Sequence, residues 1–347
     1  MKNLIKSFTA ALALTTGLTA AASATEGVNT GCDAGEEVLK LSTVTSLNGH
    51  PKGEAAKSFA AAVNERMEGR YCLEVYGSSE LYPDDDTLFD AMRRGEVHFA
   101  APSMSKLTGF TEAFQLFEIP FLFDGPLHAM EFFGSDAAKG LLAEMEDDGF
   151  YGLSFWSNGM RQFSATVPMR TPYDAQGMTF RVQASTPIIN RQIEIMGITP
   201  QKLAFSKVHD ALAAGEVQGQ QNTWSNIYSK EFYVHQAAVT ETNHTYLGYV
   251  FMTSRTFLDG LDEATRQEFI DIAELVTHER NRFAFELNQI ARAEILYDDG
   301  VILSLAPTEL QEWRDAFSPI LSEFRDVVGG DLLDAAIKIN AETKPFD

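Results

Sequence analysis

Recognisable catalytic motifs are missing from this sequence of 347 residues. There is no HExxH, no GxSxG, no GxxxxGKS/T, and no GxGxxG after a strand-like segment. The seven histidines are scattered along the chain, without the spacing that metal ligands show. These absences predict a protein that binds no metal, needs no cofactor and is not an enzyme.

Positive charge is also scarce. Lysine and arginine number 27 against 49 aspartates and glutamates, which gives a formal net charge of −22. A chain this acidic repels a phosphate backbone, so nucleic acid is a poor partner. Hydrophobic residues make up 45% of the chain and charged residues 22%. That composition is typical of a folded protein, and the length allows two domains with separate cores.

Long hydrophobic runs are absent after the first 24 residues, which argues against a membrane-embedded protein. Residues 1–24 carry two lysines within the first six positions, continue with a short apolar run from Phe8 to Leu18, and end with three small residues at 22–24. This pattern is typical of a secretory signal peptide, and the run is too short and too polar for a membrane anchor. We therefore expect an exported chain that begins near Thr25.

Cysteine occurs only twice, at Cys32 and Cys72. No CxxC pair or neighbouring histidine accompanies either residue, so a catalytic or metal-binding thiol is the weaker hypothesis. In an exported protein, two cysteines favour a disulfide. Such a bond would tie the glycine-rich leader at 31–35 to the segment that contains Cys72.

One α/β unit is predicted twice along the chain. The first copy has strands at 38–44, 71–76 and 97–100 and helices at 51–67 and 84–94. The second has strands at 178–183, 199–204 and 216–219 and helices at 186–196 and 206–214. The letters DAMRRGEV at 90–97 and DALAAGEV at 210–217 match at a constant offset of 120 residues. Two related lobes explain this match, and chance similarity of a common helix-to-strand turn is the alternative.

Two such lobes imply a cleft between them. In open α/β sheets, ligands bind beyond the carboxyl ends of the strands, here the segments 101–106 and 220–224. A further helix is predicted over 261–298 and would be about 50 Å long. Because a sustained heptad is absent, we expect this helix to brace both lobes rather than to form a coiled-coil dimer arm.

Two arginines lie in unusually apolar segments of this acidic chain. Arg181 alternates with Phe180 and Val182 on a predicted strand, and Arg161 follows the strand-like segment 151–156 through a turn. A solvated arginine on an edge strand is the plain alternative. We favour an anion site, because a guanidinium group matches a carboxylate with two parallel hydrogen bonds. Asn222 and Lys106, at the ends of the two cleft segments, are weaker candidates.

Six motifs in order then resemble the solute-binding proteins of tripartite ATP-independent periplasmic (TRAP) transporters, in particular the C4-dicarboxylate-binding branch. The motifs are HPKG at 50–53, APSMSKL at 101–107, FEIPFLFD at 117–124, FWSNGMRQFSA at 155–165, GMTFRVQAS at 177–185 and GQQNTWSNIYS at 219–229. Many relatives have ENPW where this chain has GQQNTW, which leaves the identity of the ligand open rather than its class.

The resemblance implies a two-lobe periplasmic binding protein of the α/β class, with a ligand cleft, hinge strands and closure around the ligand. One lobe would comprise 25–157 and about 248–285. The other would comprise 158–247 and about 286–347.

The resemblance also implies site residues. Arg181 would pair with a ligand carboxylate, Arg161 would be a second cationic contact, and Asn222 a polar contact. Ser103 and Lys106 would approach a second carboxylate. His50 and Trp224 complete the predicted ligand-binding set.

The implied function is the capture of a small organic acid in the periplasm, foremost a C4-dicarboxylate such as malate, succinate or fumarate, for TRAP transporter membrane subunits. Alternatives are a 2-keto acid, a sugar acid or an ectoine-like zwitterion as the ligand. A sensory module that reports to a membrane receptor is a further alternative. A periplasmic hydrolase or lyase using Glu118 or Asp124 as a base is the rival from another class.

Overall fold

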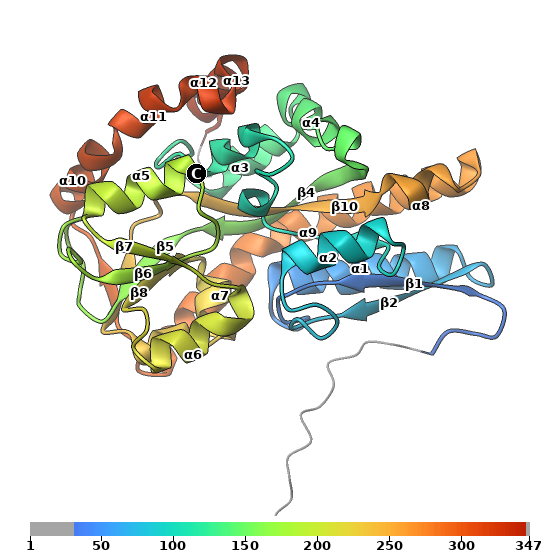
Figure 1. Ribbon diagram of the computed structural model, residues 1–347, viewed down its shortest axis with the longest axis horizontal. Helices are drawn as coiled ribbons and strands as arrows, with labels where there is room; N and C mark the ends of the chain where they lie inside the picture. Colours follow the sequence, from blue (N-terminus) through green and yellow to red (C-terminus); the bar gives the residue numbers. More distant parts are fainter. Residues whose placement is uncertain (1–30, 345–347) are drawn as a thin grey trace, which may run out of the picture.

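The computed structural model describes residues 31–344, and these residues form two β-sheets with helices packed around them (Figure 1). The predicted signal peptide at 1–24 lies outside the described residues. The first sheet has the order β2-β1-β3-β10-β4 and the second has the order β11-β9-β5-β8-β6-β7. This two-lobe α/β arrangement is the predicted fold class.

The repeated unit is confirmed, with shifts of a few residues at its boundaries. Its first copy is β1 (Glu37–Ser42), α1 (Pro51–Arg66), β2 (Tyr71–Tyr76), α2 (Asp85–Arg93) and β3 (Phe99–Ala100). Its second copy is β6 (Thr179–Val182), α5 (Pro187–Met196), β7 (Thr199–Lys202), α6 (Val208–Ala213) and β8 (Gly219–Asn222). In each copy the first strand pairs in parallel with both of the others. The two copies therefore share their topology as well as their order.

The matching letters at 90–97 and 210–217 form the same helix ending in both copies. Gly95 and Gly215 have positive φ angles of 73° and 72°. The next amide donates to a carbonyl five residues earlier in each case, Glu96 to Ala91 and Glu216 to Ala211, both at 2.9 Å. The strand predicted at 216–219 is therefore wrong at its start, because residues 216 and 217 still bond back to the helix.

Two long strands connect the lobes. β4 (Phe150–Met160) and β10 (Tyr246–Ser254) pair antiparallel in the first sheet, with two register shifts. After Arg161 the chain enters β5 (Gln162–Ala165) of the second sheet, and β9 (Ala238–Glu241) leads back toward β10. β11 (Ile302–Ser304) completes the second sheet beside β9. These crossings form the predicted hinge.

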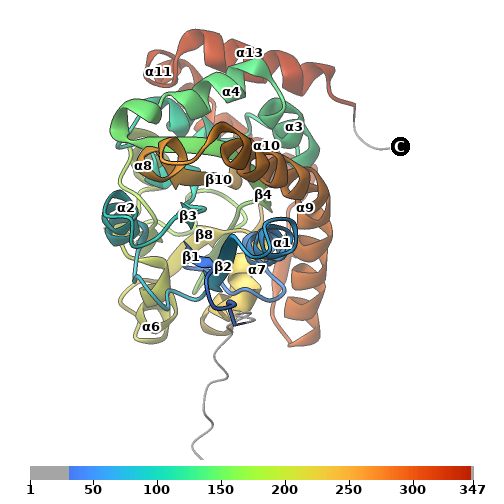
Figure 2. The ribbon, with the colours of Figure 1, turned by 90° about the vertical axis from the view of Figure 1, so that its right-hand side faces the viewer.

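The predicted bracing helix is α9 (Glu263–Tyr297). It begins as predicted, because the side chain of Asp262 accepts a hydrogen bond from the Thr265 amide at 3.1 Å. Figure 2 shows α9 beside α1 and continuing past it, and α9 also packs against β4 and α7 (Trp224–Ser229). Arg292 of α9 also pairs with Glu241 of β9 at 2.8 Å, so this helix contacts strands of both sheets.

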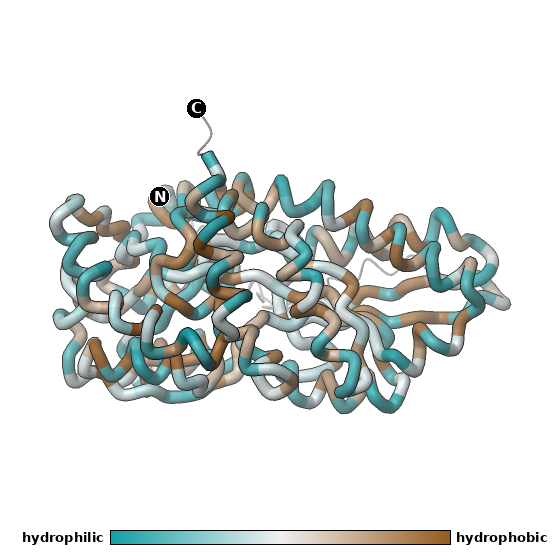
Figure 3. The backbone as a smooth tube through the Cα atoms, turned by 90° about the horizontal axis from the view of Figure 1, so that it is seen from above, coloured by the Kyte–Doolittle hydropathy of each residue, from teal (hydrophilic) through white to brown (hydrophobic). Residues whose placement is uncertain are grey.

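The remaining helices cover the outer faces. They are α3 (Pro126–Phe133), α4 (Asp136–Ala143), α8 (Arg255–Asp259), α10 (Pro307–Phe317), α11 (Pro319–Glu323), α12 (Arg325–Val328) and α13 (Gly330–Glu342). Figure 3 shows hydrophobic strands lying between helices that alternate hydrophilic and hydrophobic turns. α13 packs against α3, so the C-terminal segment reaches across the molecule. The exact residue boundaries of the two lobes stay a prediction.

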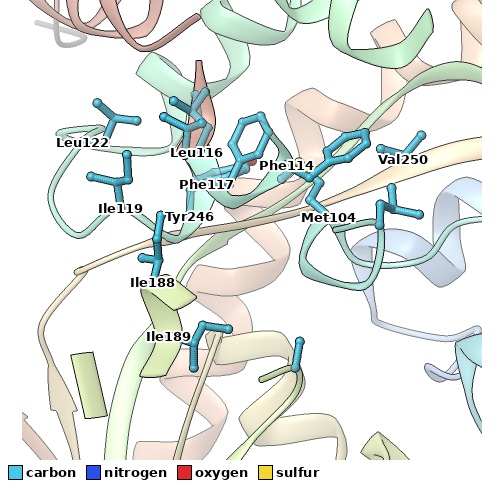
Figure 4. Packing of buried hydrophobic residues seen from close by; sticks show 14 of the residues in the cluster. Met104, Phe114, Leu116, Phe117, Ile119, Leu122, Ile188, Ile189, Tyr246 and Val250 are labelled. Carbon is cyan, nitrogen blue, oxygen red and sulfur yellow. The ribbon is translucent and has the colours of Figure 1, made fainter. Parts of the chain in front are cut away.

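The largest core cluster lies near the hinge (Figure 4). In it, Phe117 and Ile119 of the FEIPFLFD motif pack near Ile188 of α5 and near Tyr246 and Val250 of β10. Side chains from before, within and after the hinge strands therefore share one core.

The disulfide is confirmed: Cys32 and Cys72 are bonded, with Cα atoms 5.6 Å apart. It fastens the leader to β2 next to the start of β1. Within residues 31–344, no helix combines the length and the apolar character that crossing a bilayer requires.

Candidate functional site

A pocket lies between the two sheets, where the predicted cleft segments meet. One wall comes from α1, the start of α2, the short helix η1 (Met104–Lys106) and β10, and the other from β6, β8 and α7. It encloses about 490 Å³ of empty space, including the part open to solvent. Side chains from both walls line this space.

Four of the seven predicted ligand residues line this pocket: Ser103, Lys106, Arg181 and Asn222. The side chain of Asn222 is buried, and its Oδ1 accepts hydrogen bonds from the Thr223 amide at 3.1 Å and from Asn226 Nδ2 at 2.6 Å. Because the oxygen is occupied, the amide NH₂ of Asn222 is the group left for a ligand.

Arg181 is the central cation of the pocket. It is only 3% exposed, and its Nε donates to the Leu203 carbonyl at 3.1 Å. Within residues 31–344 no carboxylate lies within 4.0 Å of its guanidinium group. Burial, reinforced by the nearby Arg161 charge, lowers the pKa of Arg181 to about 9. A buried cation without a counterion is costly unless an anion completes it.

A second buried cation is Lys52, which the sequence reasoning missed. Its Nζ donates to the Ala101 carbonyl at 3.0 Å and lies 4.3 Å from the centre of the Tyr249 ring. The residue is 2% exposed, and burial lowers the pKa of its amine to about 8, against the opposing effect of Asp85. The HPKG motif was the available signal, but it pointed to His50 rather than to the lysine two positions later.

Asp85 brings a carboxylate into the same pocket. It is the first residue of α2 and is buried, and burial raises the pKa of its carboxyl group while Lys52 and Lys106 oppose that shift. The charged side chains of the wall are thus Lys52, Lys106 and Arg181 against Asp84 and Asp85. Cations therefore outnumber carboxylates by three to two on the wall of this pocket.

Arg161 lies behind the pocket wall, not on it. Its NH1 and NH2 donate to the two carboxylate oxygens of Glu118, NH2 at 2.9 Å, and NH1 also approaches Thr245 Oγ1 at 3.3 Å. Gln183, which does line the pocket, donates to Glu118 at 3.3 Å. The terminal nitrogens of Arg161 are therefore occupied by Glu118, and a direct ligand contact by Arg161 stays a prediction.

His50 also lies outside the pocket wall, although it joins the two sides. Its Nδ1 accepts from the Lys52 amide at 3.2 Å, so Nε2 carries the proton and donates to Asn226 Oδ1 at 2.8 Å. Burial, together with the charge of Lys52, lowers the pKa of His50 to about 3. The ring is thus neutral, caps the start of α1 and contacts α7 from the other sheet.

Trp224, the last predicted residue, is not brought to the pocket. It begins α7, is 4% exposed, and lies against Arg292 of α9, with 5.7 Å between the guanidinium carbon and the ring centre. It lines a separate groove behind the hinge. Within residues 31–344 no group of three or more potential metal ligands is present.

Comparisons with known proteins identify the family of this chain. The family described as bacterial extracellular solute-binding protein, family 7, matches residues 41–326. The C4-dicarboxylate-binding periplasmic protein DctP of Vibrio cholerae is 40% identical over 309 residues, 89% of this chain and 92% of that protein.

Two solved structures of TRAP periplasmic solute-binding proteins are similar. One, from Shewanella oneidensis with bound succinate, has a TM-score of 0.84 at 35% identity, covering 87% of this chain and 99% of its own. The other, from Pseudomonas aeruginosa with bound L-malate, has a TM-score of 0.79 at 37% identity, covering 82% and 99%. The chain therefore belongs to the family 7 bacterial extracellular solute-binding proteins, the family of the TRAP solute-binding proteins.

Proposed function

We propose that this protein captures a small organic diacid, foremost a C4-dicarboxylate such as malate, succinate or fumarate, in the periplasm and delivers it to the membrane subunits of a TRAP transporter. The observation that carries this proposal is Arg181, a buried guanidinium group without a carboxylate partner within residues 31–344. A ligand carboxylate would supply the missing counterion through two parallel hydrogen bonds.

The second carboxylate would be held on the opposite side of the pocket. Lys52 and Lys106 come from the side of the first sheet, whereas Arg181 and Asn222 come from the second. A diacid that contacts both sides favours the closed arrangement of the lobes. Only that arrangement brings the two lysines of one side and Arg181 of the other to the same ligand. A monoacid would satisfy one side only.

The positions of the candidate bases favour ligand binding without a chemical reaction. Glu118, the carboxylate of the rival hydrolase hypothesis, is paired with Arg161 and buried away from the pocket wall. Asp124, the other candidate base, bonds to Asn340 and lies near Arg314. Neither of these two carboxylates lines the pocket, so the hydrolase hypothesis loses both of the bases named for it.

A thermal-shift and calorimetric panel tests the function. The panel contains succinate, L-malate, fumarate, the monoacid butyrate, a 2-keto acid, D-glucuronate and ectoine. We expect stabilisation by the four-carbon diacids and none by butyrate. A shift with D-glucuronate alone would select a sugar acid, and a ligand that is chemically altered on recovery would select an enzyme.

A further inference from the structure

The hinge ribbon contains a β-bulge at Asn158. Leu247 of β10 pairs with Gly159 of β4, but the next residue, Gly248, pairs with Ser157, so Asn158 has no opposite residue. The bulge lies close to the end of β4 at Met160, just before the chain enters the second sheet. Bulges bend a strand and redirect a side chain, and they are frequent beside functional sites.

The redirected side chain of Asn158 joins three elements. Its Nδ2 donates to the Tyr249 hydroxyl at 2.7 Å. Its Oδ1 accepts from Ser225 Oγ of α7 at 2.8 Å and from Asn288 Nδ2 of α9 at 3.1 Å. Tyr249 lines the ligand pocket and carries Lys52 over its ring. One amide therefore connects the pocket wall, the second lobe and the bracing helix.

Three polar side chains of α9 bond to the hinge strand β4. Thr277 contacts Ser154 and Trp156, at 2.7 and 3.0 Å. Asn281 accepts from the Ser157 amide and donates to the Phe155 carbonyl, both at 2.8 Å. Two turns further on, Asn288 bonds to Asn158 and accepts from the Ser225 amide at 3.1 Å. Of these three helix residues, Asn288 is the one that bonds to Asn158, and Asn158 bonds to Tyr249 in the pocket wall.

We propose that Asn158 is a positioning residue that couples ligand binding to lobe closure, and this proposal rests on the proposed function. A ligand held by Lys52 fixes the ring beneath it, and the Tyr249 hydroxyl then fixes the amide of Asn158. Asn158 in turn orients Ser225 on α7 and Asn288 on α9. Because the network is buried and each member has a partner, it tolerates one relative arrangement of the lobes and disfavours others.

The test compares Asn158→Ala with the matched control Asn281→Ala, which removes similar bonds between α9 and β4 but touches no pocket residue. L-Malate is the probe, read by calorimetry and stopped-flow. We expect Asn158→Ala to bind about tenfold more weakly or worse, mainly through faster dissociation, and Asn281→Ala to stay within about twofold of the parent. Equal affinities of the two variants would overturn the proposal.

A direct readout of closure separates coupling from loss of fold. Spin labels at Glu65→Cys and Glu216→Cys, one exposed site on each lobe, report the distance between lobes. At saturating L-malate, Asn158→Ala should keep an open population that the parent and Asn281→Ala lack. Identical distance distributions in all three proteins would also overturn the proposal.

The link between Asn158 and Tyr249 can also be tested without any ligand. This test still gives a result if the proposed function is wrong. If the parent protein does not bind L-malate, urea unfolding of Asn158→Ala, Tyr249→Phe and the double variant remains informative. The two substitutions should be non-additive in the free energy of unfolding, because they remove the same bond. Additive effects would show that Asn158 and Tyr249 do not act together.

Discussion

His50, at the start of α1, donates a 2.8 Å hydrogen bond to Asn226 of α7, and this bond joins the two sides of the ligand pocket. Asn226 in turn donates to Asn222 in the pocket wall at 2.6 Å. The bond that His50 Nδ1 accepts from the Lys52 amide requires a neutral imidazole, because a protonated Nδ1 cannot accept. Closure and ligand contact are thus linked through one histidine.

The first prediction is a loss of affinity at acid pH. Burial lowers the pKa of His50 to about 3 in the closed arrangement, whereas an open, hydrated imidazole has a pKa of about 6.5. The stabilisation by neutral His50 is therefore complete above pH 6.5 and is lost as the pH falls toward 3. Between pH 7 and 5, protonation of His50 in the open form should lower the affinity for L-malate by about ten- to thirtyfold.

The control for this pH effect is His50→Asn, which can still cap α1 but does not titrate. Lys52, whose pKa is about 8, stays largely protonated across this range, and protonation of the ligand affects both proteins equally. Calorimetry should therefore give a flatter pH profile for the variant. Parallel pH profiles of the parent and the variant would rule out His50 as the source of the affinity loss.

The second prediction concerns Lys52 as the cation for the second carboxylate. Lys52→Met should weaken L-malate binding by about thirtyfold or more, because the loss of one member of a buried charge pair costs about 2–5 kcal/mol. Lys57→Met is the matched control, since Lys57 lies on the same helix and pairs with Glu54 near the surface. Equal calorimetric affinities of the two variants would contradict the assignment.

The third prediction concerns selectivity. Because Asp85 is buried in the pocket wall and lies within 4.0 Å of no cation among residues 31–344, a ligand hydroxyl can donate to it. L-Malate should bind more tightly than succinate, and Asp85→Asn should reduce that ratio by about three- to tenfold. Asp86→Asn, at the exposed neighbouring residue, should leave the ratio of the two affinities unchanged. A ratio that is the same in both variants would remove Asp85 from ligand recognition.

The fourth prediction concerns the ion pair behind the pocket. Arg161 and Glu118 are both almost fully buried, at 2% and 1% side-chain exposure. Glu118→Ala leaves an uncompensated cation and should lower the free energy of unfolding by about 3–5 kcal/mol. Urea unfolding checks this, and the double variant Glu118→Leu, Arg161→Met should recover most of the loss. If Glu118→Ala is as stable as the parent, the ion pair does not contribute to the stability of the fold.

Much of the architecture could be predicted because it depends on local patterns. The repeated helix ending around Gly95 and Gly215 is encoded in eight letters, and its hydrogen bonds lie within six residues. Arg181 was recognisable because it alternates with apolar residues on a strand that is buried. The cleft segments followed from the rule on strand ends.

The rest depends on contacts between distant segments. The partner of Arg161 is Glu118, 43 residues away, and no local pattern joins them. Lys52 contacts two distant segments, the Ala101 carbonyl after β3 and the Tyr249 ring of β10. In α9, Phe283, Phe285 and Ile290 are about half exposed, and polar residues such as Asn281 and Asn288 hold the inner face to β4.

The most direct test of the central claim is a calorimetric titration of L-malate into Arg181→Ala, with the exposed Arg170→Ala as control. We predict that Arg181→Ala binds at least about a hundredfold more weakly than the parent while Arg170→Ala binds normally. Unchanged affinity in a folded Arg181→Ala protein would contradict the account.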